Sequence, residues 1–325
     1  MTRAIIDTNL EWATAFAPAT VGNVAVGFDI LGHALIGLGD RVTVRRIEES
    51  AVRIKSIVGN DEELPTDPRK NTATAGLVRL IEDLELDFGF EVEVEKGIPL
   101  GSGMGGSAAS AVAGIVAASA LLERHLSLPE RFRYAMIGEE VASGGVHGDN
   151  IAPCLMGGLI LVRCVDPVDV VRIPVPHILR CVLVHPHMRI DTREARGVIK
   201  AEVSIKDFVT QSSNLAGFIA ACCGDDRALL KRCLKDVVIE PQRASLIPGF
   251  DAVKAAALSR GALGCSISGA GPSVFAWCDL DVDPEALRDA MISAFKEVDL
   301  AADGWVSTIN GLGAHLVERG PNRTL

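Results

Sequence analysis

The chain contains few aromatic residues and has a deficit of positive charge, and the charge deficit disfavours two classes of binding partner. Phe, Trp and Tyr make up 4% of the 325 residues, and the formal net charge is −10. Binding to nucleic acid or to an anionic membrane surface depends on a basic surface, which this balance disfavours. We therefore expect no nucleic-acid partner and no membrane partner.

Long apolar runs and paired cysteine motifs are also missing. The most apolar segment, AASAVAGIVAASALL, is too short to span a membrane, and the first twelve residues lack the pattern of a signal peptide. The eight cysteines are scattered without a CxxC pair, which indicates buried free thiols rather than disulfides or zinc ligands. These features predict a cytoplasmic protein.

The chain has enough length and enough apolar residues, 48% of the total, to build two packed lobes. Three prolines between residues 167 and 176 mark a link, so we expect one domain over residues 1–174 and a second over 175–325.

The apolar spacing predicts an α+β arrangement in both lobes, with a mostly antiparallel sheet in the second. In the first lobe we expect strands at 13–17, 41–47, 51–57, 90–94 and 157–164, and helices at 71–84, at 107–123 and from Pro129. In the second lobe we expect strands at 181–188, 262–268, 273–278, 305–309 and 313–318, and helices at 206–222, 226–234, 249–260 and 283–298.

The stretch PLGSGMGGSAAS, residues 99–110, holds four glycines between a predicted strand and a predicted helix. Glycine lets the backbone approach a bound oxygen without a Cβ in the way. The unpaired N–H groups of the following helix and its positive dipole end favour an anion there. This loop therefore predicts a phosphate-binding site, the alternative being a glycine-rich turn.

The sequence does not match the patterns of three other classes of protein with a glycine-rich loop. Gly101, Gly103 and Gly106 match GxGxxG, but no second strand ending in an acidic residue follows, as a dinucleotide fold requires. A Walker loop needs GK[ST], and this loop has no lysine. A protein kinase would carry HRD and then DFG after the loop, whereas here DFG at 87–89 comes before it and HRD is absent.

The loop resembles the second motif of the GHMP small-molecule kinases. Two further motifs of that superfamily occur in the expected order, APATVGNVAVGFDILG at 17–32 and SISGAGPSVFAW at 266–277. The resemblance implies a two-lobed fold, with an N-terminal ATP-binding α/β lobe and a C-terminal ferredoxin-like α+β lobe. It also implies ATP as the phosphate donor.

Within this superfamily the chain resembles the homoserine kinases. The resemblance rests on the opening motif and on VHGDNIAP at 146–153, TREAR at 192–196 and EPQRASLIPGF at 240–250. It implies MgATP-dependent phosphorylation of the L-homoserine hydroxyl, a step of threonine biosynthesis, and a homodimer. The alternatives are a GHMP kinase for another small alcohol and a nucleotide-bound sensor without catalysis.

The resemblance also assigns roles to residues. The expected ATP-binding residues are Pro99, Leu100, Gly101, Ser102, Gly103, Met104, Gly105, Gly106, Ser107, Ala108 and Ala109. Asp29 would bind the ammonium group of homoserine, and Arg196 and Arg243 would bind its carboxylate, because a guanidinium matches a carboxylate in two hydrogen bonds. The expected remainder of the pocket is Asn23, His147, Asn150 and Thr192.

Metal binding and catalysis are expected from three residues, Ser107, Glu139 and Asn150. Ser107 and Glu139 match the metal-linked serine and glutamate of the superfamily, although neighbouring Glu140 leaves the register open by one position. Asn150 stands where other GHMP kinases carry a catalytic aspartate. We therefore expect direct attack by a positioned hydroxyl, with Asp149 as the alternative general base.

Two other patterns suggest metal sites and are rejected. His185 and His187 have no third ligand nearby in the sequence, which favours a structural role. Asp279, Asp281 and Asp283 begin like a calcium-binding loop, but Pro284 and Ala290 replace the required Gly and Glu.

Overall fold

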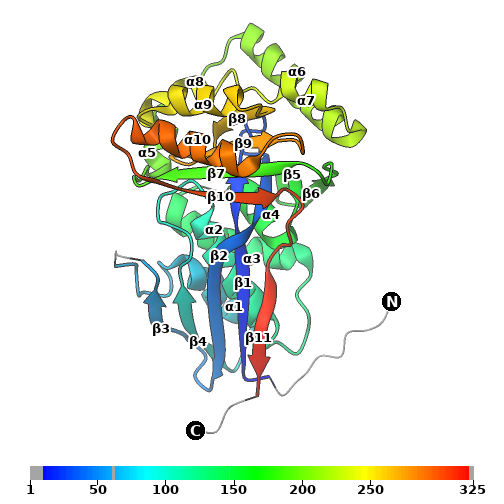
Figure 1. Ribbon diagram of the computed structural model, residues 1–325. Coiled ribbons are helices and arrows are strands. Elements are labelled where there is room, and N and C mark those ends of the chain that lie inside the picture. Colours follow the sequence, from blue (N-terminus) through cyan, green and yellow to red (C-terminus); the bar gives the residue numbers. More distant parts are fainter. Residues whose placement is uncertain (1–9, 61–62, 146, 322–325) are drawn as a thin grey trace.

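A computed structural model describes residues 10–60, 63–145 and 147–321 of the chain. Residues 1–9, which bear on the expected lack of a signal peptide, lie outside these ranges, as does Val146 of the VHGDNIAP segment. Two sheets, one above the other in Figure 1, form the centres of two lobes. Within the described ranges, none of the helices has the length and apolar character needed to cross a bilayer.

The first sheet has the order β11-β1-β2-β4-β3, with β5 paired to the other end of β2 and β6 paired to β5. All its pairs are antiparallel except β3 with β4. Its strands are β1 Trp12–Gly22, β2 Leu31–Ile47, β3 Val52–Val58, β4 Gly89–Glu95, β5 Leu159–Val165, β6 Val168–Ile173 and β11 His315–Gly320.

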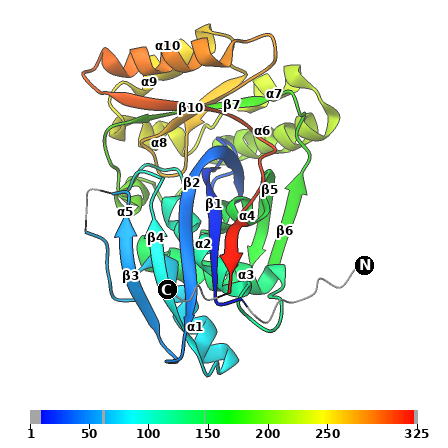
Figure 2. The ribbon, with the colours of Figure 1, turned by 60° about the horizontal axis from the view of Figure 1, so that its bottom comes forward.

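Helices of the first lobe cover one face of this sheet (Figure 2). They are α1 Thr72–Leu84, α2 Gly106–Ser119, α3 Leu128–Ser143 and α4 Gly148–Met156. Helix α2 lies at the centre and is buried on almost every side from Ala108 to Ser119. A Cβ on Gly114 would lie 2.4 Å from the carbonyl oxygen of Ala73, so α1 and α2 meet backbone to backbone. The absence of a side chain at Gly114 therefore allows this close packing of α1 and α2.

The second sheet, of order β10-β7-β9-β8, is antiparallel throughout, as expected. Its strands are β7 Arg180–Pro186, β8 Gly264–Ile267, β9 Val274–Cys278 and β10 Ala302–Thr308. The helices of this half are α5 Thr192–Gly197, α6 Ile205–Gly224, α7 Arg227–Cys233, α8 Glu240–Arg243, α9 Phe250–Ser259 and α10 Pro284–Lys296, with a 3₁₀ turn at Ala244–Leu246.

The structure corrects four local predictions. Helix α4 lies where no helix was predicted, and the proline-rich link contains β6. The strand predicted in the second lobe at 313–318 corresponds to β11, which pairs with β1 of the first sheet. Helix α2 ends at Ser119, four residues before the predicted end, because the chain turns at Ala120 and Leu121.

One apolar core includes residues of both lobes, a second core lies within the second lobe, and a buried histidine lies where the lobes meet. Trp277 on β9 donates its indole N–H to Nε2 of His33 on β2 at 3.2 Å. Nδ1 of His33 lies 3.1 Å from the carbonyl oxygen of Ala34, so this nitrogen carries the proton of a neutral ring. Burial lowers the pKa of His33 to about 4.

The buried His33 should make the stability of the protein depend on pH. Below about pH 6.5 the unfolded chain protonates this ring, whereas the folded chain does so only near pH 4. Stability should therefore be lost as the pH falls from about 6.5 to 4. We expect the stability advantage of the wild type over His33→Asn to shrink by up to about 3 kcal/mol across this window.

Urea unfolding of both proteins at several pH values measures this difference. Comparing the wild type with the variant isolates the contribution of His33 to the pH dependence from that of other groups. One such group is His185, because burial also lowers the pKa of His185 to about 4. A difference in unfolding free energy that stays constant from pH 7.5 to pH 4 would contradict the prediction.

Candidate active site

The glycine loop folds as a series of left-handed turns that lead into α2. Gly101, Gly103 and Gly105 have φ values of 61°, 75° and 68°, which residues with a Cβ rarely adopt. Gly105 is the N-cap residue of α2 and supplies no side-chain cap. The first N–H groups of α2 therefore remain available to an anion, as predicted for a phosphate site.

The other two sequence motifs hold this loop by its carbonyl groups. Thr20 N–H donates to Met104 O at 3.0 Å from the first motif. From the third motif, the Ser268 hydroxyl donates to Gly103 O at 2.8 Å and Ser273 N–H to Ser102 O at 3.2 Å. Because the carbonyls are engaged on the protein side, the three motifs form one structural unit.

The glycines are also needed for this packing, which the sequence does not reveal. A Cβ on Gly103 would lie 2.5 Å from Ser268 O and 2.6 Å from Gly271 O. A Cβ on Gly105 would lie 2.1 Å from the Thr20 hydroxyl oxygen. Larger residues at 103 and 105 would therefore disturb the contact between motifs as well as the approach of a phosphate.

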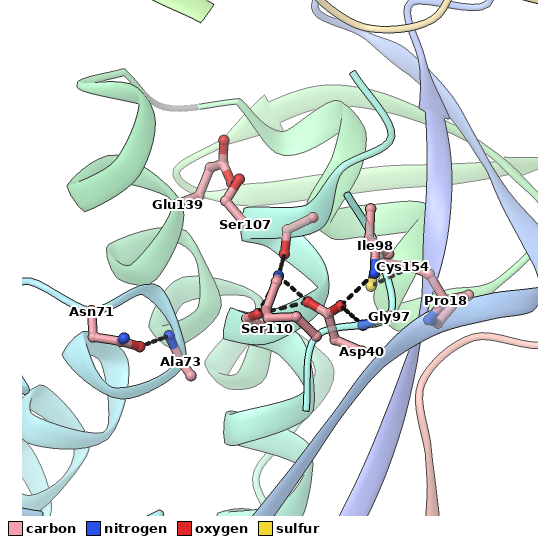
Figure 3. A network of polar contacts seen from close by, with 12 residues as sticks. Pro18, Asp40, Asn71, Ala73, Gly97, Ile98, Ser107, Ser110, Glu139 and Cys154 are labelled. Carbon is pink, nitrogen blue, oxygen red and sulfur yellow. Dashed lines mark hydrogen bonds and ion pairs between the residues drawn. The ribbon is translucent and has the colours of Figure 1, made fainter. Parts of the chain in front are cut away.

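A buried ion pair fixes the base of the loop (Figure 3). Lys96, directly after β4, pairs with Asp40 of β2 and donates to Gly106 O at 2.9 Å and to the Ser110 hydroxyl at 2.8 Å. Asp40 also accepts the N–H groups of Gly97 and Ile98 at 3.0 and 3.1 Å. This cluster fixes the start of α2 relative to the sheet.

The sequence analysis did not predict this cluster, although the alternation of residues along β4 indicates it. Along β4 the even-numbered residues, Phe90, Val92 and Val94, face the core, and Lys96 continues that series. A charged residue on the buried side of an alternating strand needs a buried partner.

A cavity of about 270 Å³ lies beside the loop and brings together most of the predicted residues. Those that line it are Asn23, Asp29, Pro99, Leu100, Gly101, Ser102, Gly103, Gly105, Gly106, Ser107, Glu139, His147, Asn150, Thr192, Arg196 and Arg243. Met104, Ala108 and Ala109 are fully buried and do not line it. The cavity also includes Asp149, the alternative general base, together with Lys96, Arg189 and Asp191, which were not among the predicted site residues.

Ser107 and Glu139 meet at the first turn of α2. The Ser107 hydroxyl donates to Oε2 of Glu139 at 2.6 Å, and Oε1 of Glu139 lies 3.9 Å from Nδ1 of His147. Glu139 on α3 is buried, whereas neighbouring Glu140 is exposed. The hydrogen bond and the burial select Glu139 as the residue that faces the cavity.

At the other end of the cavity, two arginines stack on one aromatic ring. The guanidinium carbons of Arg196 and Arg243 lie 5.4 and 5.2 Å from the centroid of Phe28. Arg243 is buried and donates to Ala195 O at 2.9 Å and to Gly269 O at 3.0 Å. Its burial and the nearby charge of Arg196 lower the pKa of Arg243. Two neighbouring guanidinium groups favour an anion between them.

Asp29 and Arg196, expected to bind opposite ends of the substrate, form an ion pair at 2.6 Å. The Nε atom of Arg196 is buried and has no hydrogen-bond partner. Asn23 positions this end of the cavity, because its Oδ1 accepts the Asp29 N–H at 3.0 Å and its Nδ2 donates to Gly269 O at 2.8 Å.

Asn150 lies on α4 and is held by two side chains. Its Oδ1 accepts the Thr20 hydroxyl at 2.7 Å, and its Nδ2 lies 3.4 Å from Oδ1 of Asp149. Asp149 is buried, and burial together with the negative charge of Asp29 raises the pKa of Asp149 to about 7. An adjacent amide and carboxyl group therefore face the region between the two ends of the cavity.

Comparisons with known proteins agree with this geometry. The family described as GHMP kinases N terminal domain matches residues 71–158, and the family described as GHMP kinases C terminal matches residues 218–297. A homoserine kinase of Xylella fastidiosa is 49% identical over 305 residues, with 94% of each chain covered. One of Xanthomonas campestris is 48% identical over 308 residues, with 95% of each chain covered.

Solved structures show the same relationship. The crystal structure of a homoserine kinase from Cytophaga hutchinsonii has a TM-score of 0.92 and 42% identity, and the match covers 98% of this chain and 100% of that one. A mevalonate kinase from L. major has a TM-score of 0.63 at 15% identity, which shows a shared fold. The chain belongs to the homoserine kinase family of the GHMP kinases.

Proposed function

We propose that this enzyme transfers the γ-phosphoryl group of ATP to the side-chain hydroxyl of L-homoserine and releases ADP and O-phospho-L-homoserine. The observation that carries the proposal is the convergence of two sites in one cavity. A glycine loop at a helix N-terminus lies at one end, and Asp29 with Arg196 and Arg243 lies at the other. The first suits a polyphosphate and the second suits the backbone of an amino acid.

ATP phosphates would bind along the glycine loop. The backbone N–H groups at the start of α2 stabilise negative charge, and the dipole of this long buried helix adds to the effect. The nearby Lys96 is neutralised by Asp40, so its role is to hold the loop. Local N–H groups thus allow a chain with a net charge of −10 to bind a polyanion.

Homoserine would replace the contact between Asp29 and Arg196. Its ammonium group would pair with Asp29, and its carboxylate would lie between Arg196 and Arg243. Each charge would exchange one ionic partner for another, so no isolated charge remains in the partly buried pocket. The unpartnered Nε of Arg196 would gain a hydrogen bond to the carboxylate.

Mg²⁺ is expected to join ATP at Ser107 and Glu139. A hydroxyl and a carboxylate oxygen 2.6 Å apart are the hard donors that magnesium prefers. Within the described ranges no group of three or more His, Cys, Asp or Glu could hold a metal alone, so the phosphates would complete the coordination. When bound, the ion neutralises charge on the β- and γ-phosphates.

The protein residues would then position the attacking hydroxyl. Asn150, fixed by Thr20, can orient the hydroxyl of homoserine toward the γ-phosphate. His147 and Thr192 would close the pocket around the amino acid. Such proximity and charge stabilisation account for catalysis without a general base.

The enzyme is further expected to form a homodimer and to work in the cytoplasm. Six of its eight thiols are buried, and burial raises the pKa of Cys265 to about 12. Thiols of this kind are unreactive and suit a reducing compartment.

A coupled assay of ADP release with homoserine, mevalonate, galactose and shikimate tests the proposed reaction. We expect turnover with homoserine at a kcat/KM at least about 100-fold above the others. Turnover of mevalonate but not homoserine would assign another substrate. Binding of ATP without any turnover would indicate a sensor.

Replacing Glu139 by Gln should distinguish a role of Glu139 in binding Mg²⁺ from a role in stabilising the fold. The amide can still accept the Ser107 hydroxyl but lacks the charge that binds Mg²⁺. We expect kcat to fall at least about 100-fold and the Mg²⁺ requirement to rise. Glu140→Gln is the matched control and should stay within about twofold, because Glu140 is exposed. Kinetics at varied Mg²⁺ measure both; strong damage from Glu140→Gln instead would refute the assignment.

Arg196→Ala should raise the KM for homoserine by about 10- to 100-fold. This increase corresponds to the loss of one hydrogen bond between charged groups at a partly exposed site. The KM for ATP should change little, and Arg196→Lys should recover only part of the loss. Arg193→Ala, which alters another exposed arginine of α5, should leave both constants unchanged. Equal increases in both KM values would show that Arg196 acts on the nucleotide or on the fold.

Asp149→Asn tests the absence of a general base. If Asn150 orients the hydroxyl and no side chain removes its proton, kcat should stay within about tenfold of the wild type, whereas loss of a true base costs up to about 10⁴-fold. Steady-state kinetics from pH 6 to 9 provide the measurement. A loss near 10⁴ would assign the base to Asp149.

A further inference from the structure

Helix α6 is mostly exposed although it carries large apolar side chains on its surface. Of its 20 residues only Phe218, Ala221 and Cys222 are buried, and all three belong to its last two turns. The first turns extend beyond the neighbouring helices at the top of Figure 1. The exposed fractions of Ile205, Phe208 and Val209 there are 78%, 61% and 54%.

Most of the exposed residues of α6 form one continuous stripe along the helix. They recur at steps of one, three and four residues, the spacing of a single helical face. The stripe consists of Ile205, Phe208, Val209, Ser212, Ser213, Ala216, Ala220 and Cys223. Its side chains are large near the N-terminus of α6 and small toward the C-terminus.

Charge is absent from this helix over most of its length. No Asp, Glu, Lys, Arg or His occurs between Phe208 and Gly224, whereas 23% of the whole chain is charged. The solvent-facing side of a surface helix typically carries charged and polar residues. The stripe therefore has the composition of a buried surface.

We propose that the stripe on α6 binds the same stripe of a second copy of this chain, with the two helices antiparallel about a twofold axis. Two copies that each carry −10 repel one another unless they meet through an uncharged surface, and α6 provides one. An anionic membrane does not fit, because a membrane-surface helix needs Lys and Arg, and α6 has only Lys206. The inference rests on the proposed homodimer and is independent of the proposed reaction.

The gradient of side-chain size makes the stripe complementary to itself. In an antiparallel pair centred between Ser212 and Ser213, Ile205 of one copy faces Ala220 of the other, and Val209 faces Ala216. Each large residue then lies against a small one, and the twofold axis repeats each of these contacts with the two copies exchanged. A parallel pair would place Phe208 against Phe208 and leave the small residues apart.

Charge-complementary variants test both the surface and the register. Val209→Lys and Ala216→Glu should each weaken self-association at least about 100-fold, because each buries an unpaired charge. Mixing the two variants should restore dimers, because the introduced lysine of one copy then faces the introduced glutamate of the other. Leu280→Asp, a change at another exposed apolar residue (64%), should leave association unchanged.

Sedimentation of each protein and of the mixture, from about 0.1 to 100 μM, gives the association constants over the range of typical dimers. A monomeric wild type would overturn the proposal, as would a Val209→Lys variant that dimerises normally. Failure of the mixture to reassociate would exclude the antiparallel register. Because sedimentation does not depend on turnover, these outcomes are distinct from failure of the kinase assay.

Discussion

The hydrogen bonds to the carbonyl groups of Ser102, Gly103 and Met104 are the constraint on which the active site depends. One donor, Thr20, belongs to β1 of the first sheet. The other two, Ser268 and Ser273, lie in the connection between β8 and β9 of the second sheet. Once these carbonyls are held, the N–H groups at the start of α2 face the cavity. The same contacts fix the two lobes relative to one another, so the packing of the lobes and the shape of the glycine loop have a common structural origin.

The positions of individual ion pairs in the cavity matter more here than the net charge of the protein. Lys96 and Asp40 form a closed pair under the loop, and Asp29 and Arg196 form a second, more accessible pair at the opposite end of the cavity. The first pair is almost completely buried and suits a permanent structural role. The second is partly exposed, so a zwitterionic ligand can exchange with it. Burial therefore separates the scaffold from the binding site.

The sequence predicted the motifs and most elements because their signals are local. Glycine spacing predicted a phosphate-binding loop at 99–110, and apolar periodicity located α1, α3, α6, α9 and α10. The pairing of β11 with β1 could not be predicted, because it joins strands about 300 residues apart and depends on the tertiary fold. Helix α4 was hidden by its glycine and Pro153, which disfavour helices when read locally.

Within the site, the sequence identified most of the residues that line the cavity but not the contacts between them. The bond from Thr20 to Asn150 joins residues 130 positions apart and depends on how two segments of the chain meet. The bond from the Asp29 N–H to Asn23 lies within the first motif, but it depends on a backbone with positive φ at both residues, which the sequence does not reveal. The buried Lys96 was detectable in principle from strand alternation. Its partner Asp40 lies 56 positions away and becomes evident only in the folded chain.

The central claim is that Arg196 binds the carboxylate of the amino acid, and a thermodynamic cycle tests it most directly. Calorimetry would compare L-homoserine with 2-amino-1,4-butanediol, which lacks the carboxylate, on the wild type and on Arg196→Ala. The account predicts that the wild type prefers homoserine and that most of this preference disappears in the variant. A preference that is equally large in both proteins would contradict it.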